Sequence, residues 1–360
     1  MGHRYIGSKS KIVNKVVDKI SKLTPQHSTV SDLMCGTASV SIALREKGFS
    51  VIANDLMTYS YHHAIVGLKF NKYPEFKAAA DFIEKFYIQD ELNLFDLSSY
   101  DKIINALSNV DSVKGYFWKE FSLDGSPKNT LKPRNYFSSI NAAKIDGIRI
   151  ALSELYSDRC ITDLEYSLLQ HDLLMATNDI ANIAGTYGHH LAKLSGRAKD
   201  EIKLSPSVLL TRKDTENHKV YKGYAEEVSK KITCDLCYID PPYMKRQYAA
   251  NYHVLETIAR GDEPEAIGVS GLRPWRDQYS NFCTKTKIRD SFKQIIENMS
   301  CSSYLISYSE DGLLSMEDFI ALLAPYGDVY IDEFKHARFR SNKSKLDQKL
   351  TEYLIHLDMS

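Results

Sequence analysis

Hydrophobic residues in the first 60 positions follow two spacings in turn. Residues 12–23 carry apolar side chains at helical spacing. A short apolar run then ends in a glycine turn at Gly36, a second helical pattern runs to Gly48, and a second strand pattern ends at Asp55. This order of strand, turn, helix and strand predicts one βαβ unit.

The pattern becomes mostly helical between residues 59 and 203, and strand patterns return after it. The expected later strands are VLLTR (208–212), CDLCYID (234–240), SSYLISYS (302–309), DVYIDEF (328–334) and TEYLIHL (351–357). Helical patterns lie between these strands, which predicts a mostly parallel, three-layer α/β sheet. Only a basic loop separates the last two strands, so we expect them to pair antiparallel at one edge.

The chain thus divides by pattern into a sheet domain and a helical insertion. Residues 1–70 and 204–360 are expected to form the sheet domain, and residues 71–203 the mostly helical insertion. A length of 360 residues favours two domains over one core. The sequence has no apolar run of 18 residues and no apolar core of a signal peptide, so we expect a cytoplasmic protein without a membrane span.

The charge balance gives no overall signal for a nucleic-acid partner. Lys and Arg number 46, as do Asp and Glu, so the formal net charge is zero. A general nucleic-acid binder is usually basic overall, but a neutral chain can still carry a local basic face. The positions of the basic residues therefore matter more than their sum.

The six cysteines are scattered along the chain and are expected to be reduced and mostly buried. Cys234 and Cys237 form a CxxC, a spacing found in zinc and redox sites. No second CxxC accompanies it, and His189 and His190 lack ligand spacing. These histidines lie in an apolar strand pattern, where burial is the simpler explanation, so we expect no metal site.

Three residues at the ends of the first two strands form a candidate cofactor site. Asp32 precedes the turn, Gly36 lets the backbone turn tightly, and Asp55 stands where an acid binds ribose in dinucleotide folds. Only one glycine of the G-x-G-x-x-G pattern is present. A pyrophosphate needs the close approach that the other glycines permit, so the turn favours S-adenosylmethionine (SAM) over NAD. A glycine that only turns the chain is the alternative.

A second candidate site begins where an apolar run ends in the sequence DPPY. Pro241 and Pro242 fix the loop beyond the strand, in the crevice where α/β sheets bind ligands. The Asp240 carboxylate and the Pro241 carbonyl would be rigid acceptors for an exocyclic amine, and Tyr243 a flat face for a base. This arrangement predicts methyl transfer to the amine, catalysed by positioning and electrostatics. A loop that only ends the strand is the alternative.

The motifs and their order resemble the amino-group DNA methyltransferases. The alpha group, which includes the Dam-like, D12-class adenine methyltransferases, has motifs similar to RYIGSK (4–9), DLMCGTASVS (32–41), NDL (54–56) and DPPY (240–243), in this order. Other segments resemble the subset related to the FokI modification enzyme: NIAGTYGHHLAK (182–193), SYSEDG (307–312) and TEYLIHL (351–357). The similarity spans nearly the whole chain apart from about 71–153.

The resemblance implies a role for each matching position. Tyr5 and Lys9 would contact SAM, and Asp55 would hold its ribose. Asp32 and Gly36 would line the cofactor turn. The target adenine would be held next to the methyl group by Asp240, Pro241, Pro242 and Tyr243, with Asp240 also bordering the cofactor.

One position departs from the family pattern. Family members often carry an acid before the alanine in the segment upstream of DPPY, and that acid contacts the adenine of SAM. Here Tyr224 stands at that position, with Glu226 nearby. This departure affects either the expected affinity for SAM or the way in which this segment is aligned with the family.

Contacts with DNA are expected from three basic segments. A base inside a duplex cannot reach such a pocket, so it must be flipped out while phosphate contacts hold the duplex. Lys245 and Arg246 beside the candidate site are expected to make such contacts, as are Arg338, Arg340 and Lys343 in the late basic loop. Sequence reading is expected in the insertion, in a polar loop that contains Arg134. A solvated polar loop is the alternative for each segment.

Together these features predict a Rossmann-like, SAM-dependent methyltransferase sheet with an inserted helical target-recognition domain. The expected reaction is methylation of adenine N6 in double-stranded DNA, as the modification component of a restriction–modification system with a cognate endonuclease as partner. Cytosine-N4 methylation is the first alternative, although that branch more often has Ser in place of Asp240. The others are methylation of RNA or protein glutamine, SAM or DNA binding without catalysis, and an NAD-dependent oxidoreductase.

Overall fold

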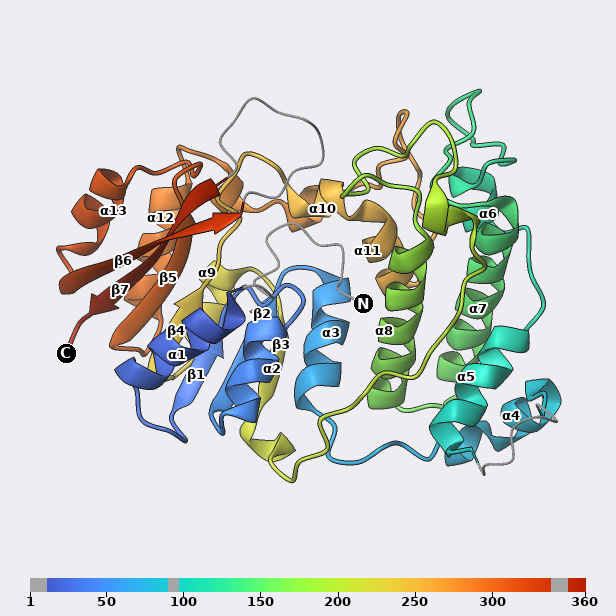
Figure 1. Ribbon diagram of the computed structural model, residues 1–360, viewed down its shortest axis with the longest axis horizontal. Coiled ribbons are helices and arrows are strands. Elements are labelled where there is room, and N and C mark those ends of the chain that lie inside the picture. Colours follow the sequence, from blue (N-terminus) through green and yellow to red (C-terminus); the bar gives the residue numbers. More distant parts are fainter. Residues whose placement is uncertain (1–11, 90–96, 338–348) are drawn as a thin grey trace. The chain divides into compact units, whose positions relative to one another are not determined.

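The computed structural model describes residues 12–89, 97–337 and 349–360, which form two compact units (Figure 1). The sheet unit contains the described residues up to Leu68, together with those of Asp214–Ala249 and Gln278–Ser360. The helical unit contains the described residues of Lys69–Lys213 and Ala250–Asp277. Each unit is therefore built from segments that are far apart in the sequence.

Seven strands form one sheet in the described part of the sheet unit, in the order β3-β2-β1-β4-β5-β7-β6. Their bounds are β1 Thr29–Asp32, β2 Ser50–Asp55, β3 Lys219–Lys222, β4 Leu236–Ile239, β5 Ser303–Ser309, β6 Asp328–Ala337 and β7 Lys349–Asp358. The first five strands pair in parallel, and β7 runs antiparallel to both β5 and β6. Because Asp32 at the end of β1 pairs with Ala53 and Tyr238, the carboxyl ends of β1, β2 and β4 meet at one edge of the sheet.

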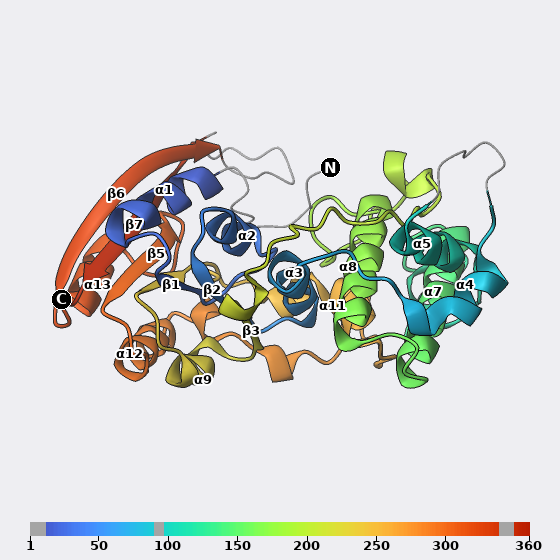
Figure 2. The ribbon, with the colours of Figure 1, turned by 90° about the horizontal axis from the view of Figure 1, so that it is seen from below.

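Helices cover both faces of this sheet (Figure 2). One face carries α1 (Val13–Leu23), α2 (Ser39–Glu46) and α3 (Thr58–Leu68); the other carries α9 (Ala225–Val228), α12 (Ile288–Asn298) and α13 (Met316–Leu323). Side chains alternate between the two faces along each strand. Leu236 and Tyr238 of β4 are therefore buried in the core under α1–α3, whereas Cys237 and Ile239 are buried in the core under α9, α12 and α13.

The helical unit is built mainly on two long helices that pack against each other, α7 (Ser139–Ser157) and α8 (Asp163–Ile180). The other helices are α4 (Ala80–Phe86), α5 (Ser99–Asn109), α6 (Tyr116–Phe121) and α11 (His253–Arg260), while α10 (Tyr248–Asn251) crosses the boundary between the units. Side-chain caps fix where α8 begins: the Thr162 hydroxyl accepts the N–H of Glu165, whose carboxylate accepts the N–H of Thr162. None of the described helices is both long and apolar enough to cross a bilayer.

The expected α/β sheet and its first βαβ unit are confirmed, as is the antiparallel pair at the edge. The expected strand VLLTR at 208–212 is wrong: this segment has no regular secondary structure and pairs with no described strand, and Val208 is 93% exposed. Its backbone bonds to a side chain instead: the Tyr73 hydroxyl accepts the N–H of Leu209 at 3.3 Å, and just before the segment the Tyr100 hydroxyl accepts the N–H of Ser207 at 2.9 Å. The sequence did not predict β3, the parallel strand at the edge of the sheet next to β2.

Two further expectations differ from the structure. His189 and His190 lie in a loop rather than a buried strand; His189 is exposed and His190 half-buried. The helical unit also extends beyond the expected insertion at 71–203, because it takes residues up to Lys213 and the segment Ala250–Asp277. The apolar face of α11 in that segment packs against α8, with Val254, Leu255 and Ile258 buried.

Candidate active site

A pocket opens where β1, β2 and β4 end at the same edge of the sheet. It encloses about 960 Å³, including the open solvent at its mouth. Its lining includes every residue of the two candidate sites at the described strand ends: Asp32, Gly36, Asp55, Asp240, Pro241, Pro242 and Tyr243. The structure thus joins two motifs that lie about 200 residues apart in the sequence.

The turn between β1 and α2 forms one wall of the pocket. Gly36 has φ +53° and Ala38 has φ +58°, so both adopt the left-handed conformation. Glycine adopts this conformation without strain, whereas alanine does so at a cost of about 1 kcal/mol. The turn therefore takes a left-handed conformation at Ala38, the position where the G-x-G-x-x-G pattern has a glycine.

Asp55 ties the end of β2 to this turn. One carboxylate oxygen accepts the N–H of Gly36 at 2.8 Å, and the other accepts the N–H of Met57 at 2.9 Å. The backbone N–H of Cys35 donates to the carbonyl of Asn54 at 2.9 Å. These bonds fix Asp55 at the lip of the pocket, next to the turn.

Asp32 is a buried acid with an unusual proton affinity. Burial, helped by the negative charges of Asp240 and Asp55 and opposed by the hydrogen bond from Ser41, raises the pKa of its carboxyl to about 7. The Ser41 hydroxyl donates to the Asp32 carboxylate at 2.6 Å. Three carboxylates thus converge on one cavity, which gives it a negative potential that suits a cationic ligand.

The loop after β4 is held from two sides. Pro241 is buried, and the carbonyl of Tyr243 accepts the N–H of Leu313 at 3.1 Å. The half-buried Tyr243 ring lies edge-on to Tyr308, with ring centroids 5.9 Å apart. The loop therefore presents Asp240 and the Tyr243 ring from a fixed backbone.

Tyr224 and Glu226 both line the pocket, at the start of α9. The N–H of Gly223 donates to the carbonyl of Asp55 at 3.0 Å, so this segment lies beside the end of β2. Glu226 is 6% exposed, and its carboxylate accepts the Ser291 hydroxyl at 2.7 Å. A buried carboxylate is therefore present in the segment where the sequence shows Tyr224 in place of the usual acid.

The comparison with known families decides between the possible activities of such a pocket. The family model of the D12 class N6 adenine-specific DNA methyltransferases matches residues 5–319. The chain belongs to this family. The membership confirms the resemblance seen in the motifs, and it does not favour the cytosine-N4 alternative.

Relatives of this chain include several modification enzymes. M.CviAII of Paramecium bursaria Chlorella virus 1 is 33% identical over 98% of this chain and 97% of its own length. M.NlaIII of Neisseria lactamica is 29% identical over 95% of this chain and 93% of its own length. M.FokI of Planomicrobium okeanokoites is 30% identical over 98% of this chain but only 52% of its own length, so the chain spans about half of that relative.

The pocket also has lining residues that the motifs did not reveal. Tyr248, Gln278 and Ser280 come from the two segments that flank Ala250–Asp277 in the sequence. Gln247 joins these segments: its side chain donates to the Ser280 carbonyl at 3.0 Å and accepts the Ser280 N–H at 2.8 Å. No spacing or composition signal marks these residues, because their proximity arises only when the chain returns to the sheet.

The residues expected to contact DNA have three different outcomes in the structure. Lys245 and Arg246 are exposed, directly after the DPPY loop. The residues Tyr5, Lys9, Arg338, Arg340 and Lys343, expected to contact cofactor or DNA, lie outside the described residues. The prediction for Arg134 needs correction: its side chain is fully buried and paired with Glu120, so it cannot reach a phosphate or a base edge.

Proposed function

We propose that the protein transfers a methyl group from SAM to N6 of an adenine in a specific sequence of double-stranded DNA. The observation that carries the proposal is the convergence of Asp240 with Asp32 and Asp55 on one cavity. Family membership supports the choice of DNA and of adenine. The negative charge of the cavity supports the choice of SAM as cofactor.

The charges of the pocket fit SAM, which carries a sulfonium and an ammonium cation. We assign Asp32, Gly36 and Asp55 to cofactor binding, because their carboxylates and turn lie together in the lining. Asp32 would lose its proton on meeting a cation, since a nearby positive charge favours the ionised acid. Tyr5 and Lys9 remain proposed cofactor contacts on the resemblance alone.

SAM supplies an electrophilic methyl group when it is bound. The chain's own residues orient the nucleophile: the Asp240 carboxylate and the Pro241 carbonyl accept the two N–H groups of the adenine amine. Tyr243 stacks on the base, and Pro242 holds the loop. The amine nitrogen can then direct its lone pair at the methyl group, and Asp240 is the acceptor for the proton that N6 loses. Catalysis by this arrangement is orientation and electrostatic stabilisation.

The DNA side of the proposal follows from the geometry of a duplex. The adenine must leave the base stack to enter a pocket, at a cost of a few kcal/mol. We assign Lys245 and Arg246 to the phosphates beside the flipped base, because they are exposed directly after Tyr243. Arg338, Arg340 and Lys343 remain proposed phosphate contacts from the sequence.

We also propose that the protein is the modification component of a restriction–modification system. Its relatives bear the names of Type II methyltransferases and modification methylases. The partner would be an endonuclease that cleaves the same sequence when it is unmethylated. Co-expression tests this: an endonuclease from the neighbouring genome region should be lethal alone and tolerated together with this chain, and equal lethality would contradict the proposal.

The experiment that tests the reaction uses unmethylated genomic DNA. The protein is incubated with SAM and the DNA, and modification-sensitive long-read sequencing then reads the product. We expect N6-methyladenine in one short sequence context and none without SAM. Methylcytosine in place of methyladenine, or no modification at all, would contradict the proposed function.

A further inference from the structure

Three loops of the helical unit are joined by hydrogen bonds although many of their side chains are exposed. The tip hairpin, residues 266–272, is one of them. Ile267 and Leu272 exchange two backbone hydrogen bonds of 2.8 Å, and Gly268 and Gly271 have φ of +72° and +67°. A Cβ at Gly271 would lie 2.8 Å from the Phe121 ring, so only glycine fits this close approach.

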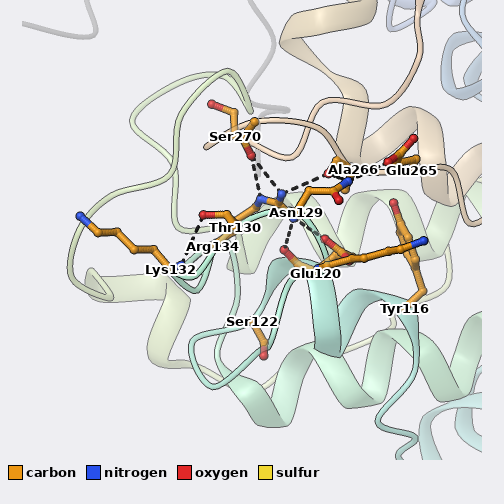
Figure 3. A network of polar contacts seen from close by, with 12 residues as sticks. Tyr116, Glu120, Ser122, Asn129, Thr130, Lys132, Arg134, Glu265, Ala266 and Ser270 are labelled. Atoms are coloured by element: carbon orange, nitrogen blue, oxygen red, sulfur yellow. Dashed lines mark hydrogen bonds and ion pairs between the residues drawn. The ribbon is translucent and has the colours of Figure 1, made fainter.

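Arg134 holds the tip hairpin against a second loop (Figure 3). Its guanidinium donates to the carbonyls of Gly268 at 3.0 Å and Ala266 at 3.2 Å, and Glu120 neutralises its charge. Asn129 adds a bond of 2.9 Å to Glu265, just before the hairpin. Burying a guanidinium is costly unless it is paired and fully bonded, so this network is a specific device for fixing the hairpin.

A third loop, which begins at residue 182, is hydrogen-bonded to both the tip hairpin and the loop that contains Arg134. The Ser270 hydroxyl donates to the carbonyl of Gly188 at 2.6 Å. The buried side chain of Asn182 donates to the carbonyls of Asn135 at 2.8 Å and Leu191 at 3.0 Å. Residues 126–135 and 182–199, named here the basic loops, therefore form one rigid surface with the tip hairpin.

The exposed side chains of this surface have two kinds of chemistry. The basic loops expose Lys128, Lys132, Lys193, Arg197 and Lys199 and contain no Asp or Glu, while the exposed acids Asp124, Asp200 and Glu201 flank them in the sequence. The tip hairpin exposes apolar side chains, with Ile267 52% and Val269 73% exposed. Exposed apolar side chains beside polar and charged ones are typical of a surface that a partner covers.

We propose that the tip hairpin is a DNA-contacting wedge. Ile267 and Val269 insert against the bases of the bound duplex, while the basic loops hold its phosphates and Arg134 acts as a positioning residue. Acid-free basic loops beside an apolar tip complement a polyanion with an apolar base stack, and apolar side chains on rigid supports are a known means of parting base steps. The inference rests on the proposed function, because it takes the DNA substrate from it.

The test compares the DNA affinity of the Ile267→Ser/Val269→Ser variant with that of the wild type. The probe is a short duplex with the sequence that the wild type methylates, measured by fluorescence anisotropy over a series of salt concentrations. We expect binding about tenfold weaker with an unchanged salt slope, since no phosphate contact is lost. Lys128→Ala/Lys132→Ala should instead make the slope shallower, by about 0.9 for each phosphate contact removed.

Val208→Ser and Ile150→Ser are the matched controls, because both remove exposed apolar side chains of the same unit. We expect them to bind DNA as the wild type does, and all variants to keep its melting temperature. If the wild type methylates DNA and the tip variant binds with unchanged affinity, the wedge is wrong while the proposed function stands. A tip variant that alters only self-association, seen by sedimentation, would likewise overturn it. A wild type that methylates no DNA overturns both.

Discussion

Asp32 shows how a single buried residue can couple the pocket to pH. Burial raises the pKa of its carboxyl to about 7. An unfolded Asp ionises near pH 3.8, so between about pH 4 and 7 the folded state holds one proton more than the unfolded state. The contribution of Asp32 to stability is therefore greatest below pH 4 and is lost as the pH rises to 7.

The same proton opposes the binding of a cationic cofactor. We predict that the affinity for SAM rises with pH between about 5.5 and 7, by up to about tenfold per unit, as Asp32 ionises. The Asp32→Asn variant should bind SAM more weakly at pH 7 and lose this dependence. Isothermal titration calorimetry without DNA gives both dissociation constants. A wild type whose SAM affinity is constant over this range would contradict the role of Asp32.

Glu226 is the second residue with a specific expectation. Glu226 is the first acidic residue after Tyr224 in the sequence, and it lines the pocket. We expect Glu226→Gln to weaken SAM binding about tenfold, the effect of losing one hydrogen bond to a charged group. Ser291→Ala, which removes only the support of that carboxylate, should weaken it less. Equal SAM affinity in Glu226→Gln and wild type would remove Glu226 from the cofactor site.

At the scale of elements, Arg134 shows why burial cannot be read from residue type. The sequence places it in a polar, basic loop, which is typical of a surface that contacts DNA. Its structural role depends on Glu120 and on a hairpin more than 130 residues away. Local patterns did predict the parallel strands β1, β2, β4 and β5 and the edge pair, because each has a dense apolar period, but they missed β3, whose four residues are KVYK. They failed at VLLTR, because an apolar run forms a strand only when a partner strand is in reach.

The Arg134–Glu120 pair gives a prediction about the stability of the helical unit. Arg134→Met leaves the Glu120 carboxylate buried without its partner, so we expect the free energy of unfolding to fall by about 3–5 kcal/mol. Glu120→Gln/Arg134→Met should lose less than that, because no buried charge remains. Trp118 and Trp275 both lie in the helical unit, so their fluorescence in urea reports this unit. Equal losses in the two variants would contradict a charge pair that acts through burial.

At the scale of the whole molecule, the sequence predicted the fold class and the family, but not how the chain is shared between units. The motifs mark strand ends, and parallel strand ends meet at one edge, so Asp32, Asp55 and Asp240 could be expected together. The return of Ala250–Asp277 to the helical unit could not. The buried face of α11 has the same helical period whichever unit it packs against.

The account depends on Asp240, and single-turnover methyl transfer tests it most directly. Labelled SAM, excess enzyme and duplex DNA are mixed, and the rate is compared between wild type and Asp240→Ala, with SAM affinity and melting temperature measured on the same samples. We predict a loss of about 10²–10³-fold or more in the transfer rate, the size expected for removing one preorganised polar group, with the fold retained. Transfer by a folded Asp240→Ala protein at close to the wild-type rate would contradict the account.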